Sequence, residues 1–189
     1  MSLMGVRASR ANEPPQHDAT APFTKMRNVT ISAVTEAHAD EAGGGALDLT
    51  SGWTDLDANV ASRVLLITLG AGSNTDYTVT AVDDEGVTHV ETVSVDASDS
   101  NTTLRGYKSI TSVTTAGDPG ATTEFDWGDT LVSPPARGIH VGTAGDIACI
   151  AAEDSTAVTV PDVAAGVWPV RLKRVNITNT TASGLVLGW

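Results

Sequence analysis

The chain has 189 residues, a formal net charge of −12 and an abundance of Thr, Val and Gly. That length fits one medium domain or two small ones, and residues that favour strands and turns predict an all-β fold. The negative charge disfavours nucleic-acid binding because phosphates would be repelled, and no apolar run approaches the roughly 18 residues of a membrane span.

Residues 1–27 are predicted to form an extended N-terminal arm. They show no sustained hydrophobic period, and their polar start lacks the apolar stretch of a secretory signal. Such a basic segment ahead of an acidic body is either a solvated tail or an arm that docks on an acidic partner surface. The candidate partner contacts in it are Arg7, Arg10, Lys25 and Arg27.

A β-sandwich module is predicted for residues 28–133. Val29 and Ile31 alternate with polar residues, which predicts a first strand, whereas the acidic, Gly-rich segment 36–45 predicts a loop. His38 and its acidic neighbours in this loop could gather around a metal ion, but an exposed acidic loop accounts for the same composition. No metal site is therefore predicted.

The clearest elements of this module come next. The apolar run 64–69 is too short for a helix, so it predicts a central strand buried on both faces. Residues 77–95 predict a hairpin around the turn 83–86, because Gly86 allows the turn and the residues before it alternate with period two. His89 is expected on the solvent side of the hairpin. Strands are also predicted at 107–115 and 123–127.

Ser133-Pro134-Pro135 is the predicted boundary, since consecutive prolines cannot join a central ladder. Short strands separated by turn residues then predict a second β module over 137–189. Cys149 is predicted to be a small buried hydrophobe, and His140 is expected to point away from the apolar face. The whole pattern predicts an antiparallel β-sandwich, Ig-like or jelly-roll-like, with a small second β module.

The end of the chain carries a basic strand and a terminal tryptophan. Residues 170–177 predict a strand with Arg171 and Lys173 on one side and Leu172 and Arg174 on the other. In an acidic chain this strand is either a solvated edge or a contact for an acidic neighbour. Trp189 ends an apolar strand that is expected to pack in the core or at a subunit interface. Arg171, Lys173 and Trp189 therefore join the candidate partner contacts.

Motifs that would indicate catalysis or a cofactor are missing. Gly70-Ala71-Gly72 lacks the third glycine of a dinucleotide loop, and the sequence has neither a nucleophile elbow nor a phosphate-binding Gly-Lys-Ser. The acidic turns 83–85 and 96–99 do not match an EF-hand loop. We therefore predict no catalytic residue, cofactor or metal. The paired carboxylates of a glycoside hydrolase stay open, because they need to meet only in space.

Several segments resemble virion proteins. Residues 138–147, 163–170 and 174–182, with the motifs Val-Gly-Thr-Ala-Gly-Asp, Ala-Gly-x-x-Pro and Arg-Val-Asn, are similar to the C-terminal module of head-spike base proteins of tailed phages and gene transfer agents. Residues 64–128 resemble a looser pattern of virion decoration and minor head proteins, which includes an Asp-x-x-Gly turn and a closing Trp-Gly.

This resemblance implies a non-enzymatic virion structural protein, a head-spike base or vertex turret on the capsid exterior that holds a spike or fibre. It implies a pentamer, because a capsid vertex has five-fold symmetry. The implied partner is the major capsid protein, with assembly in the host cytoplasm. A trimeric capsid decoration or cement protein and a receptor- or glycan-binding spike module are the alternatives.

Overall fold

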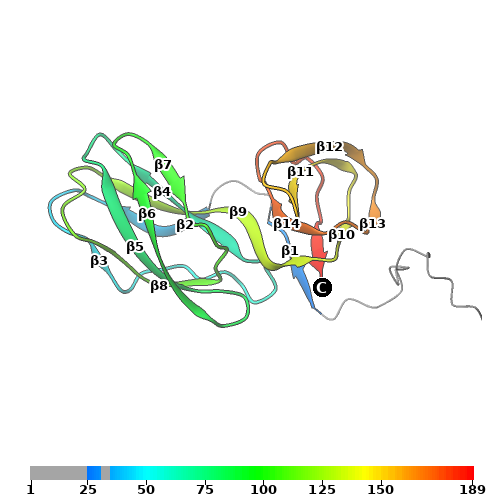
Figure 1. The fold of residues 1–189 in the computed structure, drawn as a ribbon, viewed down its shortest axis with the longest axis horizontal. Helices are drawn as coiled ribbons and strands as arrows, with labels where there is room; N and C mark the ends of the chain where they lie inside the picture. The colour runs from blue at the N-terminus through cyan, green and yellow to red at the C-terminus, as the bar shows by residue number, and fades with distance from the viewer. Residues whose placement is uncertain (1–24, 31–34) are drawn as a thin grey trace, which may run out of the picture.

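The structure of the chain is a computed structural model, which describes residues 25–30 and 35–189. The strands pair antiparallel in three sheets that form two lobes, and no helix occurs in the described residues (Figure 1). The predicted all-β sandwich with a small second module is confirmed. In chain order the strands are β1 (Met26–Asn28), β2 (Thr35–Glu41), β3 (Asp48–Leu49), β4 (Arg63–Leu69), β5 (Thr75–Val82), β6 (Thr88–Val95), β7 (Ser100–Thr102), β8 (Ser109–Thr115), β9 (Thr123–Ala136), β10 (Gly138–Val141), β11 (Gly145–Ala151), β12 (Val158–Val163), β13 (Gly166–Trp168), β14 (Leu172–Val175) and β15 (Val186–Gly188).

The first lobe is a sandwich of two layers. One layer contains β2, the first half of β9, β4 and β7, and the other has the order β3-β8-β5-β6. Alternate residues of β4 and β5 point between the layers, so Leu65, Ile67, Tyr77 and Val79 are completely buried there. The predicted hairpin at 77–95 is confirmed as the β5–β6 pair. The predicted strand at 64–69 is confirmed as β4, which lies inside its sheet, but its second face is only partly buried at Leu66 and Thr68.

The second lobe encloses a separate core. β12, β11, β14 and the second half of β9 form one layer, and β1, β15, β10 and β13 form the other. Ile139, Ile147 and Leu187 are at most 1% exposed in this core. Cys149 is buried among them, and His140 is exposed next to Ile139, so the predictions for these two side chains are confirmed.

β9 belongs to both lobes (Figure 1). Its first residues pair with β2 and β4, and its last residues pair with β14. The register against β14 shifts between Leu131 and Ala136, and the prolines at 134 and 135 lie inside this irregular stretch. A bulge removes residues from the ladder without ending the strand. The residues that the sequence predicts as a boundary, 133–135, therefore lie in a bulged part of β9.

Predictions near the N-terminus need correction. The predicted loop at 36–45 is wrong over residues 36–41, which belong to β2. Ala37 is completely buried, and β9 supplies the backbone partners, so pairing and burial outweigh the weak strand propensity of this acidic segment. The first strand is β1, which pairs with β15 and ends before Val29. Ile31 and arm residues 1–24 lie outside the described residues.

Candidate interaction surfaces

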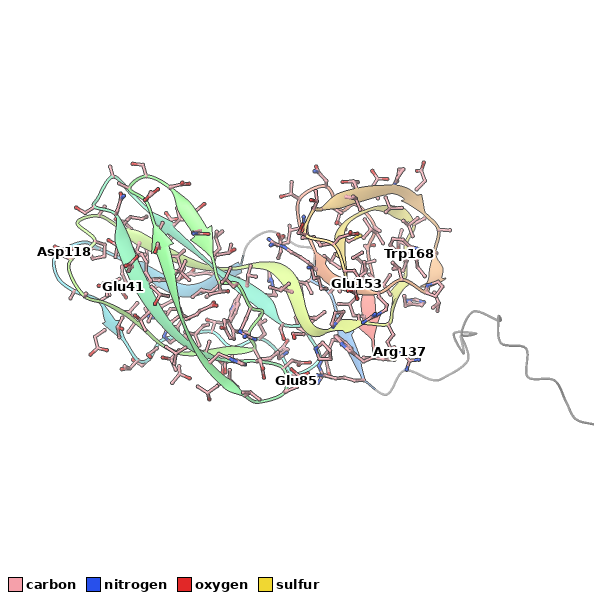
Figure 2. All side chains as sticks on the ribbon, viewed as in Figure 1. Glu41, Glu85, Asp118, Arg137, Glu153 and Trp168 are labelled. Carbon is pink, nitrogen blue, oxygen red and sulfur yellow. The ribbon has the colours of Figure 1, made fainter. Side chains whose placement is uncertain are left out.

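An apolar surface, here called the outer strip, covers residues 157–170 on β12 and β13. Each of these strands ends its sheet, so its outer backbone groups have no strand partner within the described residues. No residue of the outer strip is buried, and Asp162 is its one charged residue. Val158 and Val167 are 52% and 64% exposed. Trp168 marks the outer edge of the second lobe in Figure 2.

Local backbone geometry produces these two open edges. Pro161 lies within β12 and cannot donate to a ladder, which an edge strand tolerates because it pairs on one side only. The chain then passes from β12 in one sheet to β13 in the other, and Gly166 at the start of β13 has a φ of 130°, which is unfavourable for residues with a side chain. This connection therefore presents both edges at the same end of the lobe.

A second feature, here called the inter-lobe cleft, has a volume of about 540 Å³. It lies between the β5–β6 turn, the loop after β7 and the second half of β9. Two aliphatic side chains in its wall face solvent, since Val90 is 67% exposed and Leu104 is 86% exposed. Carboxylates outnumber bases among its charged lining residues, which are Asp83, Asp84, Glu85, Glu91, Arg105 and Lys173.

Two predicted contact residues bind carboxylates at the rim of this cleft. Lys25 forms ion pairs with Asp84 and with Glu85, and Arg27 Nε donates to Asp84 Oδ1 at 3.2 Å. These contacts join β1 of the second lobe to the β5–β6 turn of the first, and Figure 2 shows Glu85 at this junction. Lys25 and Arg27 thus have partners within the chain, and their contact with another protein stays a prediction.

Glu91 and Tyr107 form a polar spot by the cleft. Burial raises the pKa of the Glu91 carboxyl, against the opposing effects of the Leu104 amide, the Tyr107 hydroxyl and the Arg105 charge. Burial and the Glu91 charge also raise the pKa of Tyr107. Glu91 Oε1 and the Tyr107 hydroxyl oxygen are both buried, and no atom of the described residues lies in ordinary hydrogen-bond geometry to either of them. Such atoms destabilise the fold unless a further group binds them.

Asp83 organises the neighbouring turn. Its Oδ1 accepts hydrogen bonds from the amides of Glu85 and Val87, and its Oδ2 lies 2.8 Å from His89 Nε2. Burial alone would raise the pKa of Asp83, but the hydrogen bonds from His89 and the two amides outweigh it and lower the pKa. His89 is accordingly half-buried against this carboxylate, where the sequence predicted a position on the solvent side.

Replacing Asp83 with asparagine is expected to lower the urea midpoint at pH 7 and to lower it less at pH 2.5. A carboxyl with a lowered pKa in the folded state stabilises the fold above its ordinary pKa of about 4, and this stabilisation disappears as the pH falls through the lowered value. Urea titrations of the wild type and the variant between pH 7 and pH 2.5 measure how far the difference between their midpoints shrinks. Asp154→Asn, at an exposed position, is the control. A deficit of the same size at both pH values would contradict the assignment.

The predicted basic strand is β14, and it lies inside a sheet. It pairs with β11 on one side and with β9 on the other, so the interpretation as a solvated edge is wrong. The predicted alternation fails as well, because both ladders shift register within the strand. Leu172 and Val175 are consequently both buried, although they are three residues apart.

The bases around β14 have acidic neighbours within the chain. Arg171 Nη1 lies 3.3 Å from Glu153 Oε1 at the surface, and Arg174 Nη2 donates to Asp129 Oδ2 at 2.6 Å. Lys173 lines the inter-lobe cleft. The acidic neighbour that was one of the two interpretations of this strand is therefore partly supplied by the same molecule.

Trp189 lies at the junction of β1, β9 and β15. Its Nε1 donates to the Pro134 carbonyl oxygen at 2.8 Å, and Lys25 Nζ lies 5.5 Å from the ring centroid. The ring packs against the core of the second lobe. Among the other candidate contacts, Arg7 and Arg10 lie outside the described residues.

His38 and the first two tryptophans pack in the first lobe. His38 is 8% exposed, and its ring centroid lies 4.6 Å from that of Trp53. Trp127 is 1% exposed, and Trp53 packs against the same core, so these two rings do not form an exposed platform for a sugar. In the described part of the chain, no group of three or more His, Cys, Asp or Glu side chains could hold a metal ion.

Comparison of the chain with protein-family models, curated proteins and solved structures finds no match. Among residues 25–30 and 35–189, no helix is long and apolar enough to span a membrane. The sequence interpretation did not single out the outer strip as a contact surface. The sequence nevertheless contains a sign of this surface, because residues 157–170 include only one charged residue although the chain as a whole is acidic.

Proposed function

We propose that this chain is a non-enzymatic virion structural protein, a homo-oligomeric head-spike base or vertex turret on the capsid exterior of a tailed virus. It would hold a spike or fibre and contact the major capsid protein. The observation that supports this proposal is the outer strip, an exposed apolar surface with two open strand edges. Residues 163–170 of the strip also belong to the segments that resemble head-spike base proteins.

Charge explains why subunits would meet at this surface. Identical subunits of formal charge −12 repel one another wherever their carboxylates approach. The outer strip avoids this repulsion because Asp162 is its one charge. Valines at an open edge also bury apolar area against a neighbour while the backbone groups gain partners. A pentamer fits a capsid vertex, and a trimer would favour the alternative role as a decoration or cement protein.

The double variant Val158→Asp/Val167→Asp is expected to convert the oligomer into monomers without unfolding it. Each aspartate would add a charge to an apolar contact, whereas exposed positions tolerate substitution within about 0.5 kcal/mol in the monomer. Light scattering after size-exclusion chromatography gives the mass, and circular dichroism checks the fold.

The matched control is Val87→Asp/Val90→Asp, because these two valines are 51% and 67% exposed in the first lobe. The control is expected to keep the wild-type mass. A wild-type chain that is monomeric at micromolar concentration and does not bind capsids would contradict the proposed function. The mass of the wild-type oligomer separates five subunits from three.

A further inference from the structure

The outer strip contains two unlike strand edges. Val158 on β12 lies opposite Cys149 of β11, and opposite residues of an antiparallel pair point to the same face of the sheet. Since Cys149 belongs to the core of the second lobe, Val158 is on the core face, and yet it is 52% exposed. Val167 on β13 lies opposite the exposed His140, so it points away from the core. The two valines therefore belong to two different surfaces.

The two edges match in length. β12 pairs regularly with β11 over residues 158–160, and its register shifts between residues 160 and 163. β13 pairs with β10 over residues 166–168. Each edge thus offers three residues in a regular strand, and their outer backbone groups have no strand partner in the part of the chain that the structure describes. Two such edges can complete each other as one ladder.

The symmetry of a ring indicates which edges meet. A surface that contacts its own copy across a two-fold axis closes the assembly at two subunits, whereas a ring of three or five requires head-to-tail contact between two different surfaces. We propose that β12 of one subunit pairs with β13 of the next, with Val158 against Val167 of that next subunit. This inference rests on the proposed function, because it assumes a ring of identical subunits.

Charge restricts the contact to this end of the molecule. Residues 35–128, which build most of the first lobe, contain 16 carboxylates and three bases, so two first lobes repel each other. Residues 129–189 contain five carboxylates and four bases. β13 lies at the end of the second lobe that is farthest from the first lobe (Figure 1). Pairing of β12 with β13 therefore joins the nearly neutral lobes and keeps the acidic lobes apart.

Cysteine cross-linking in the full chain tests this pairing. All variants carry Cys149→Ala, because the native thiol lies opposite residue 158 and would compete for the reagent. The reagent is a bismaleimide with a reach of about 8 Å, which covers a register shift of two residues. Val158→Cys/Val167→Cys is expected to give a ladder of covalent products up to the full ring on a denaturing gel. Val158→Cys alone and Val167→Cys alone are expected to give no covalent dimer.

The matched control is Val87→Cys/Val158→Cys, because Val87 is 51% exposed in the first lobe. The control is expected to give no ladder. Covalent dimers from either single variant would overturn the pairing in favour of a two-fold contact. A wild-type oligomer whose double variant gives no ladder would also overturn the pairing, while the proposed function would stand. A monomeric wild type would overturn the proposed function itself.

Exchanging charges at the same two positions gives an independent measurement. In Val158→Lys/Val167→Asp, a head-to-tail contact places opposite charges next to each other, so light scattering is expected to give the wild-type mass. A two-fold contact would instead place like charges together. A Val158→Lys/Val167→Asp chain that is folded by circular dichroism but monomeric, at a concentration at which wild type assembles, would overturn the pairing.

Discussion

Replacing Gly106 with alanine is expected to lower the free energy of unfolding by about 3 kcal/mol, the upper part of the range for overpacking. A β-carbon at this position would lie 1.8 Å from the Leu131 carbonyl oxygen and 3.1 Å from Ser62 Cβ. Leu131 cannot move aside easily, because its amide donates to the Ser62 carbonyl oxygen at 3.0 Å and its strand connects the two lobes. The added methyl group therefore forces β9 away from the loop after β7.

Urea denaturation followed by tryptophan fluorescence measures this loss. Gly117→Ala is the matched control, since a β-carbon there meets no atom within 4 Å. We expect the control to unfold within about 0.5 kcal/mol of wild type. A Gly106→Ala protein as stable as the control would show that β9 can shift at this point without penalty.

Replacing Arg63 with methionine is expected to lower the free energy of unfolding by about 3 kcal/mol, because two buried carbonyl groups would lose their donor. Arg63 is 1% exposed, and its guanidinium donates to the carbonyl oxygens of Gly128 and Trp127 at 2.6 and 2.5 Å. β9 has one extra residue here, since Arg63 pairs with Thr130 while Leu65 pairs with Trp127. The side chain thus supplies hydrogen bonds that the bulged ladder cannot.

Burial lowers the pKa of Arg63, whereas the charges of Asp129 and Asp126 raise it. Arg63→Lys is expected to recover less than half of the lost free energy of unfolding, because a single ammonium cannot reproduce the planar geometry with which the guanidinium donates to two carbonyl oxygens. Arg137→Met, at an exposed position, is the control. Urea denaturation gives the free energy of unfolding of the three variants relative to wild type. An Arg63→Met protein as stable as wild type would contradict the role assigned to these hydrogen bonds.

Periodicity made parts of this fold predictable. The strand at 64–69 and the alternation of Tyr77, Val79 and Ala81 appear as predicted, but β4 is not buried on both faces along its length, because Leu66 and Thr68 are only partly buried. The position of Cys149 followed from its apolar neighbours. In each case the hydrophobicity of neighbouring residues was enough to indicate which side chains are buried.

Long-range pairing made other parts unpredictable. β2 forms although its sequence is acidic, because β9 provides its backbone partners and Ala37 provides its buried contact. β14 is an interior strand although its bases resemble a solvated edge, because β9 and β11 pair with it on both sides and bury Leu172 and Val175, while Asp129 pairs with Arg174. The inter-lobe cleft depends on residues from 62 to 173, and no single stretch of the sequence reveals that they meet.

The shared strand β9 also determines how the molecule would respond to force. Its 14 residues span up to about 46 Å of continuous backbone. Tension between the first lobe and the outer end of the second would run along this backbone, and the neighbouring ladders of both lobes would have to slide in shear before the lobes could separate. Two lobes on a flexible tether would part at the tether, whereas this architecture carries a mechanical load as one rod.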